Sequence, residues 1–160
     1  MSMNTVPERL AALRAAMAAN GVAVYLIPVG DPHASEYLPA HYTSLTWFSG
    51  FHGENSNLVV TRTGSALWAD GRYFVQAEKE LAGTEIELQR MGEPGVPTVE
   101  EYCADALNEG EVLGLCGLTA STALVNGLKK ALEKKGASIR TLALEDELWT
   151  CLLYTSDAAD

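Results

Sequence analysis

Three short stretches of the chain carry ionisable side chains at a spacing that could support chemistry. The first is a proline-containing loop with Asp31, His33 and Glu36, which are residue types that bind divalent metals. A catalytic metal needs several such ligands aimed at one point, plus an open position. Polar residues beside proline are also ordinary turn chemistry, with Asp31 capping a turn and His33 on its surface. We favour the turn, and a small metalloenzyme built on these residues stays the weaker hypothesis.

The second stretch is the polar run FHGENSN, residues 51–57, which places His52 and Glu54 between an aromatic corner and a strand. Loops that hold ionisable side chains on a rigid scaffold are where ligand contacts concentrate. A solvated loop whose asparagines accommodate unusual backbone angles explains the same residues equally well. The residues alone leave both interpretations open.

The third stretch is the corner Asp70-Gly71-Arg72, which follows a short strand. Asp70 suits the cap of a helix that Tyr73 begins, because its carboxylate can accept from free N–H groups near the positive end of the helix dipole. Gly71 permits a sharp turn, and Arg72 can pair with Asp70. We predict a structural corner without chemistry of its own. The helix after it is expected to feed the core through Phe74, Val75 and Ala77.

Several common functional patterns do not occur in the sequence. It has no G-x-G-x-x-G after the first apolar run, no Gly-Lys-Ser/Thr phosphate cradle and no G-x-S-x-G elbow. A formal net charge of −10 disfavours a nucleic-acid partner. No stretch approaches the roughly 20 apolar residues of a membrane span, and no secretion signal is present. We expect neither nucleic acid nor membrane as partner, and a cytoplasmic location.

The three cysteines, Cys103, Cys116 and Cys151, are odd in number and form no C-x-x-C pair. Neither a disulfide scaffold nor a zinc knuckle fits this spacing. We interpret them as reduced structural thiols.

Capping and turn signals divide the chain into alternating helices and strands. Thr5-Val6-Pro7-Glu8 is a capping box that predicts a helix as far as Asn20, and Thr98-Val99-Glu100-Glu101 starts another. A turn over 62–65 predicts a hairpin. Strands are predicted at 22–27, 57–61, 66–68, 85–89, 112–115 and 138–142, and further helices at 73–81 and 121–135. The fold class is therefore α/β, a mixed sheet flanked by helices.

These stretches together resemble the N-terminal domain of the Xaa-Pro aminopeptidases (aminopeptidase P) of the creatinase/prolidase superfamily. The matching segments are the Pro-x-x-Asp-x-His-x-Ser-Glu-Tyr run at 28–37, the aromatic-Ser-Gly-Phe corner at 48–51 and Leu-Trp-x-Asp-Gly-Arg-Tyr-Phe at 67–74. The segment LEDELWT, 144–150, is similar to the start of the connection to the second domain in the three-domain branch. The resemblance covers about 6–150.

The resemblance implies a ribonuclease-H-like domain that serves subunit association and shapes the mouth of the active site. In that family the peptidase chemistry belongs to a C-terminal pita-bread domain, where two Asp, one His and two Glu hold two divalent metals, usually manganese. No catalytic residue and no metal ligand carries over to this chain, so we expect no cofactor here and no activity from the chain alone. The implied partners are the catalytic domain, a second subunit and peptides with proline in second position.

The resemblance also implies a role for the loop after the aromatic corner. In creatinase relatives this loop reaches the active site of the partner subunit and offers an aromatic and an arginine to the substrate. Counted back from the strand at 58–60, those positions fall on His52 and Glu54, which depart from the family pattern. We expect Glu54 to face the free ammonium terminus of the substrate and His52 to line the pocket.

For domain organisation, we predict one domain over 1–150, with its core at about 6–142 and the interdomain connection starting at 143–150. Residues 151–160, CLLYTSDAAD, resemble a translated sequencing adapter and are interpreted as a non-native tail. The leading hypothesis is the truncated N-terminal domain of a Xaa-Pro aminopeptidase. The alternative is a free-standing binding or assembly module of the same fold.

Overall fold

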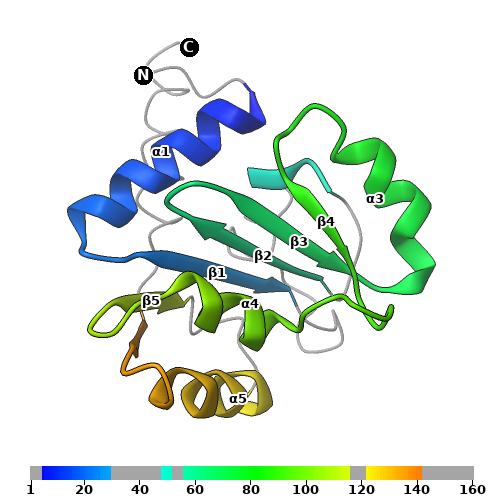
Figure 1. Cartoon of the computed structure of the whole chain (residues 1–160). Helices are drawn as coiled ribbons and strands as arrows, with labels where there is room; N and C mark the ends of the chain where they lie inside the picture. The colour runs from blue at the N-terminus through cyan, green and yellow to red at the C-terminus, as the bar shows by residue number, and fades with distance from the viewer. Residues whose placement is uncertain (1–4, 30–47, 52–55, 116–121, 142–160) are drawn as a thin grey trace.

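The computed structural model describes residues 5–29, 48–51, 56–115 and 122–141 (Figure 1). The elements are α1 (Val6–Ala19), β1 (Val24–Val29), β2 (Ser56–Thr61), β3 (Ser65–Ala69), the 3-10 helix η2 (Gly71–Tyr73), α3 (Phe74–Glu80), β4 (Glu87–Arg90), α4 (Val99–Ala106), β5 (Val112–Leu115), α5 (Thr122–Glu133) and β6 (Ser138–Thr141). Helices and strands alternate as predicted, apart from the β2–β3 hairpin.

The strands form one six-stranded sheet in the order β4-β3-β2-β1-β5-β6. β2 pairs antiparallel with both of its neighbours, β1 and β3, whereas the pairs β1–β5, β5–β6 and β3–β4 are parallel. Among the described strands, β2 alone therefore runs against the common direction. The predicted mixed α/β sheet is confirmed.

Helices cover both faces of the sheet, with α1 and α3 on one side and α4 and α5 on the other (Figure 1). β1 shows why its sequence is apolar without interruption. Tyr25 and Ile27 enter the core under α1, while Val24 and Leu26 enter the core under α4 and α5. Because alternate side chains of a strand point to opposite faces, a strand buried on both faces must be apolar throughout.

The helix caps follow the local sequence. The Thr5 hydroxyl accepts a hydrogen bond from the backbone N–H of Glu8 at 3.3 Å, and α1 ends at Ala19 with Asn20 as its C-cap, before Gly21, whose φ is +70°. At α4, Thr98 and Glu101 cap each other reciprocally, with distances of 3.1 and 3.2 Å. Both predicted helix starts are confirmed to the residue.

One prediction about packing is wrong. Val75 does not pack into the core, because it is 66% exposed, whereas Ala77 is fully buried. Successive residues of an α-helix are separated by about 100°, so a position two residues before Ala77 lies on the far side of α3. Phe74 is half-buried, and the Arg90 guanidinium lies 5.7 Å from its ring centre.

The close approach of β5 to β1 makes Gly114 the most demanding glycine in the sheet. A Cβ there would lie 2.7 Å from Cδ1 of Tyr25 and 3.0 Å from Cγ1 of Val22. We expect Gly114→Ala to lower the free energy of unfolding by about 1–3 kcal/mol, because the buried Tyr25 ring has no room to move. Urea denaturation of the full chain measures this.

Gly71→Ala is the matched control. Gly71 is not among the glycines with positive φ, and a Cβ there would meet nothing within 4 Å. Its free energy of unfolding should change by no more than about 0.5 kcal/mol. Equal losses in the two variants would contradict the proposed clash at Tyr25.

Candidate functional site

The topology gathers loops at one edge of the sheet. β1, β3, β4, β5 and β6 run in one direction, so their carboxyl ends lie at the same edge, and β2 begins there. In open α/β sheets, ligands bind outside the carboxyl ends of the strands, where loops from several strands meet. We call this edge, where the parallel strands end, the carboxyl edge of the sheet, and we take it as the candidate site.

Each of the three stretches singled out in the sequence connects to this edge. β1 ends there before the segment with Asp31, His33 and Glu36, β2 begins there after the segment with His52 and Glu54, and β3 ends there before Asp70. The two segments 30–47 and 52–55 lie outside the described residues, so the positions of those five side chains are not assigned. Asp70, Gly71 and Arg72 are described.

The aromatic corner before β2 is anchored in the core. Phe48 and Phe51 are buried, with residual exposures of 1% and 0%. Ser49 is buried between them, and its hydroxyl accepts a hydrogen bond from the Phe51 backbone N–H at 3.1 Å. Gly50 has a φ of +79°, a conformation that L side chains rarely adopt. The chain therefore enters the 52–55 segment from a fixed point.

The second corner, residues 70–73, is held together by hydrogen bonds to the Asp70 carboxylate. The Asp70 carboxylate caps η2 by accepting from the Arg72 backbone N–H at 2.9 Å, and it accepts again from the Arg72 guanidinium at 2.9 and 3.3 Å. The same guanidinium lies 5.3 Å from the ring centre of Tyr73. Asp70 therefore caps the short 3-10 turn that leads into α3 rather than α3 itself.

An edge-to-face contact joins the two corners. The rings of Phe51 and Tyr73 are perpendicular, with their centroids 6.0 Å apart. Such pairs stabilise by roughly 0.5–1.5 kcal/mol beyond the burial of their area. This contact is what the sequence could not reveal, because the two rings are far apart in the chain.

Ser56, the first residue of β2, was not singled out from the sequence. Its hydroxyl is fully buried and has no hydrogen-bond partner among the described residues, as is also true of Ser65. Buried hydroxyl groups without a hydrogen-bond partner are uncommon in folded proteins, so each one calls for a structural or functional explanation. A serine that begins a strand gives no such signal in the sequence.

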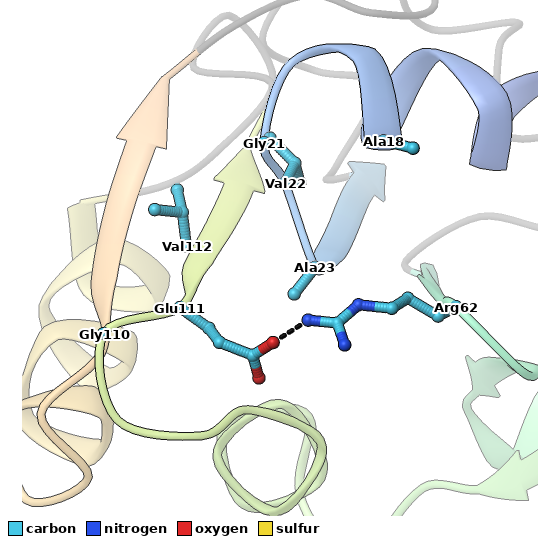
Figure 2. A pocket seen from close by; sticks show the side chains of 8 residues that line it. All are labelled: Ala18, Gly21, Val22, Ala23, Arg62, Gly110, Glu111 and Val112. Carbon is cyan, nitrogen blue, oxygen red and sulfur yellow. Dashed lines mark ion pairs between the residues drawn. The ribbon is translucent and has the colours of Figure 1, made fainter.

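A shallow groove opens at the opposite edge of the sheet, where β1 and β5 begin (Figure 2). It is lined by Ala18, Gly21, Val22, Ala23, Arg62, Gly110, Glu111 and Val112. Arg62 forms an ion pair with Glu111 across it, and Glu111 also accepts from the Asn108 backbone N–H at 2.7 Å. The two charges neutralise each other, so the groove offers no net charge to a ligand.

Cys103 is a free, fully buried thiol on the core face of α4. Burial and the nearby Glu100 carboxylate raise its pKa far above the usual range, so the thiol stays protonated at neutral pH. Because the thiolate is the nucleophile, Cys103 is a packing residue. Cys116 and Cys151 lie outside the described residues.

The described part of the chain carries neither a metal-binding cluster nor a membrane-spanning helix. Within it, no group of three or more His, Cys, Asp or Glu side chains is arranged to hold a metal ion. In the same ranges, no helix is both long and apolar enough to cross a membrane.

The arrangement of strands and helices defines an α/β domain of a known kind. The N-terminal domain of the peptidase PepQ from Mycobacterium tuberculosis superimposes with a TM-score of 0.62 at 26% identity, over 88% of this chain and 97% of that one. The sequence profile of the Creatinase/Prolidase N-terminal domain matches residues 9–151. The chain belongs to the creatinase/prolidase N-terminal domain family.

The similar proteins include Xaa-Pro aminopeptidases. Aminopeptidase P2 of Arabidopsis thaliana is 40% identical over 149 residues, which cover 90% of this chain. The probable Xaa-Pro aminopeptidase P of Pyricularia oryzae is 36% identical over 92% of this chain. The X-prolyl aminopeptidase of Caenorhabditis elegans, a cytosolic enzyme with a di-nuclear active site, superimposes over 92% of this chain with a TM-score of 0.79 and 32% identity.

The relatives are much longer than this chain. It spans 21% of the Arabidopsis protein, 24% of the Pyricularia protein and 26% of the Caenorhabditis chain. The match therefore concerns one domain of those proteins.

The cap at Asp70 should contribute more to stability than its ion pair. We expect Asp70→Ala to cost about 1 kcal/mol of unfolding free energy, because it removes the acceptor for the Arg72 backbone N–H. Arg72→Gln keeps the cap and removes an exposed ion pair, so it should cost no more than about 0.5 kcal/mol. Chemical denaturation compares the two, and an equal loss would show that the ion pair holds the corner.

Proposed function

We propose that this chain is the non-catalytic N-terminal domain of a cytoplasmic Xaa-Pro aminopeptidase. In this proposal the domain shapes the mouth of the active site and contributes to a homodimer. The full enzyme would remove an N-terminal residue that precedes proline. The observation that carries the proposal is the 40% identity to aminopeptidase P2 across 90% of this chain.

Three further observations support this assignment. The superposition on the Caenorhabditis X-prolyl aminopeptidase has a TM-score of 0.79, above the 0.62 for the PepQ domain. The cytosolic character of the Caenorhabditis enzyme favours a cytoplasmic location for the full enzyme. Two anchored corners, joined by the Phe51–Tyr73 contact, give the carboxyl edge a rigid base from which loops can face another domain.

The metal chemistry belongs elsewhere in this proposal. Hydrolysis by a pair of metals requires a cage of carboxylate and imidazole ligands, and the described residues do not provide one. We therefore assign no catalytic step to this chain. The two divalent ions, proposed to be manganese, would be held by the part of the longer relatives that this chain does not match.

A domain exchange tests the proposal. The matching N-terminal segment of the Arabidopsis protein is replaced by this chain, and hydrolysis of peptides with proline in second position is measured with added manganese. We expect the chimera to be active, because the domain keeps its position and shape. The chain alone and the Arabidopsis protein without its N-terminal segment are expected to be inactive. A folded but inactive chimera, or an active isolated chain, would refute the proposal.

We also propose that Glu54 faces the free ammonium group of the substrate and that His52 lines the same pocket. In the chimera, Glu54→Gln should raise KM about tenfold with little change in kcat, because a hydrogen bond between charged groups is worth about 1.5 kcal/mol. Steady-state kinetics on peptides with a free amino terminus measures KM and kcat. The inhibition constant of the N-acetylated peptide should be the same with and without the substitution, because that peptide has no ammonium group.

Glu133→Gln is the matched control, since Glu133 is an exposed carboxylate at the last residue of α5. It should leave KM unchanged. An unchanged KM in Glu54→Gln across several peptides would remove Glu54 from the substrate pocket and leave the family assignment intact.

A further inference from the structure

The lysines of the chain are concentrated on one element. Four of the five in the sequence, Lys129, Lys130, Lys134 and Lys135, fall within seven residues at the end of α5 and in the turn after it. All four are exposed. We call this set the lysine cluster. It stands out because the whole chain has a formal net charge of −10.

The lysine cluster differs from the arginines in having no ion-pair partner among the described residues. Arg62, Arg72 and Arg90 each form an ion pair, and Arg14 and Arg140 donate to backbone carbonyls at 2.8 and 3.0 Å. None of the four lysines pairs with a carboxylate of the described residues. Within the described residues, no salt bridge neutralises these four charges.

Helix stability does not account for the cluster. Cations near the last carbonyls of a helix interact favourably with its dipole, and Lys129 lies four residues before Glu133, but Lys130 and Lys134 are also four residues apart and repel each other. The favourable and unfavourable effects are of comparable size. Packing also fails as an explanation, because α5 contacts the core through Leu128 and Leu132, which are buried.

The surroundings limit what the cluster can bind. α4 packs beside α5 (Figure 1), and exposed acids lie on α4, on the loop after it and within the cluster itself: Glu101, Asp105, Glu109 and Glu133. A long polyanion or a flat anionic membrane laid on α5 would also meet those acids. The cluster itself spans about two helical turns, roughly 10 Å. That length matches about three residues of an extended peptide.

We propose that the lysine cluster is a docking site for a short acidic segment of a partner protein, with about three carboxylates in a row. Charge complementarity carries this assignment: a compact group of exposed ammonium groups, without a salt bridge to any described residue, lies on a protein whose net charge of −10 repels anions. Ammonium groups on flexible stems suit carboxylates presented without fixed geometry. The site lies at the carboxyl end of α5 and in the turn after it, away from the carboxyl edge of the sheet, and it is independent of the proposed peptidase role.

Binding of a fluorescent hexaglutamate peptide to the full chain tests this proposal by anisotropy. We expect binding that weakens at least tenfold between 50 and 500 mM NaCl, because exposed charges are screened. Replacing the four lysines by glutamine should weaken it at least tenfold, and replacing them by arginine should restore it. Lys79→Gln, which removes the remaining lysine on α3, should have no effect.

Three outcomes would overturn the proposal. The first is hexaglutamate binding that the glutamine variant does not weaken. The second is tighter, cluster-dependent binding of a 20-nucleotide oligo-dT or of phosphatidylserine vesicles, which would assign the site to polyanions. The third is self-association in sedimentation that the glutamine variant abolishes, which would assign the cluster to a second copy of the chain.

Discussion

The antiparallel pairing of β1 with β2 is the constraint on which the rest of the structure depends. Six residue pairs, from Val24–Thr61 to Val29–Ser56, fix the register at the centre of the sheet. A shift by one residue would turn Tyr25 and Ile27 away from the core under α1. Since β2 runs against the other described strands, this pairing also decides that the chain after the aromatic corner enters the sheet at the carboxyl ends of its neighbours.

Much of this architecture could be predicted from local signals. The strand 112–115 coincides with β5, and the capping residues Thr5 and Thr98 are where the sequence places them. Such signals depend only on residues that are close together in the chain, so they can be recognised without knowledge of the fold. The predicted strand 85–89 instead begins at Glu87, because Glu85 adopts a φ of +70° that interrupts the extended chain. No residue type at that position announces this conformation.

The candidate site was predictable only in its parts. Asp70 reads as a cap because its partners are the next residues in the chain, and the structure places it on η2. That Phe51 meets Tyr73 depends on β2 and β3 pairing in one register, which propensity does not determine. For Gly71 the sequence suggested a sharp turn that requires glycine. The structure shows no such requirement, because Gly71 does not have a positive φ and a Cβ there would meet nothing within 4 Å. The roles expected for His52 and Glu54 are based on the family resemblance alone.

The two outermost strands of the described sheet also limit the pairing of its edges with strands of other molecules. β4 and β6 have four residues each, and both carry exposed charged side chains, Glu87 and Arg90 on one and Arg140 on the other. Arg90 and Arg140 are tied to Glu78 and to the backbone of Asn20. Short, charged borders are poor templates for recruiting a foreign strand. The fold thus resists growing sideways into fibrils.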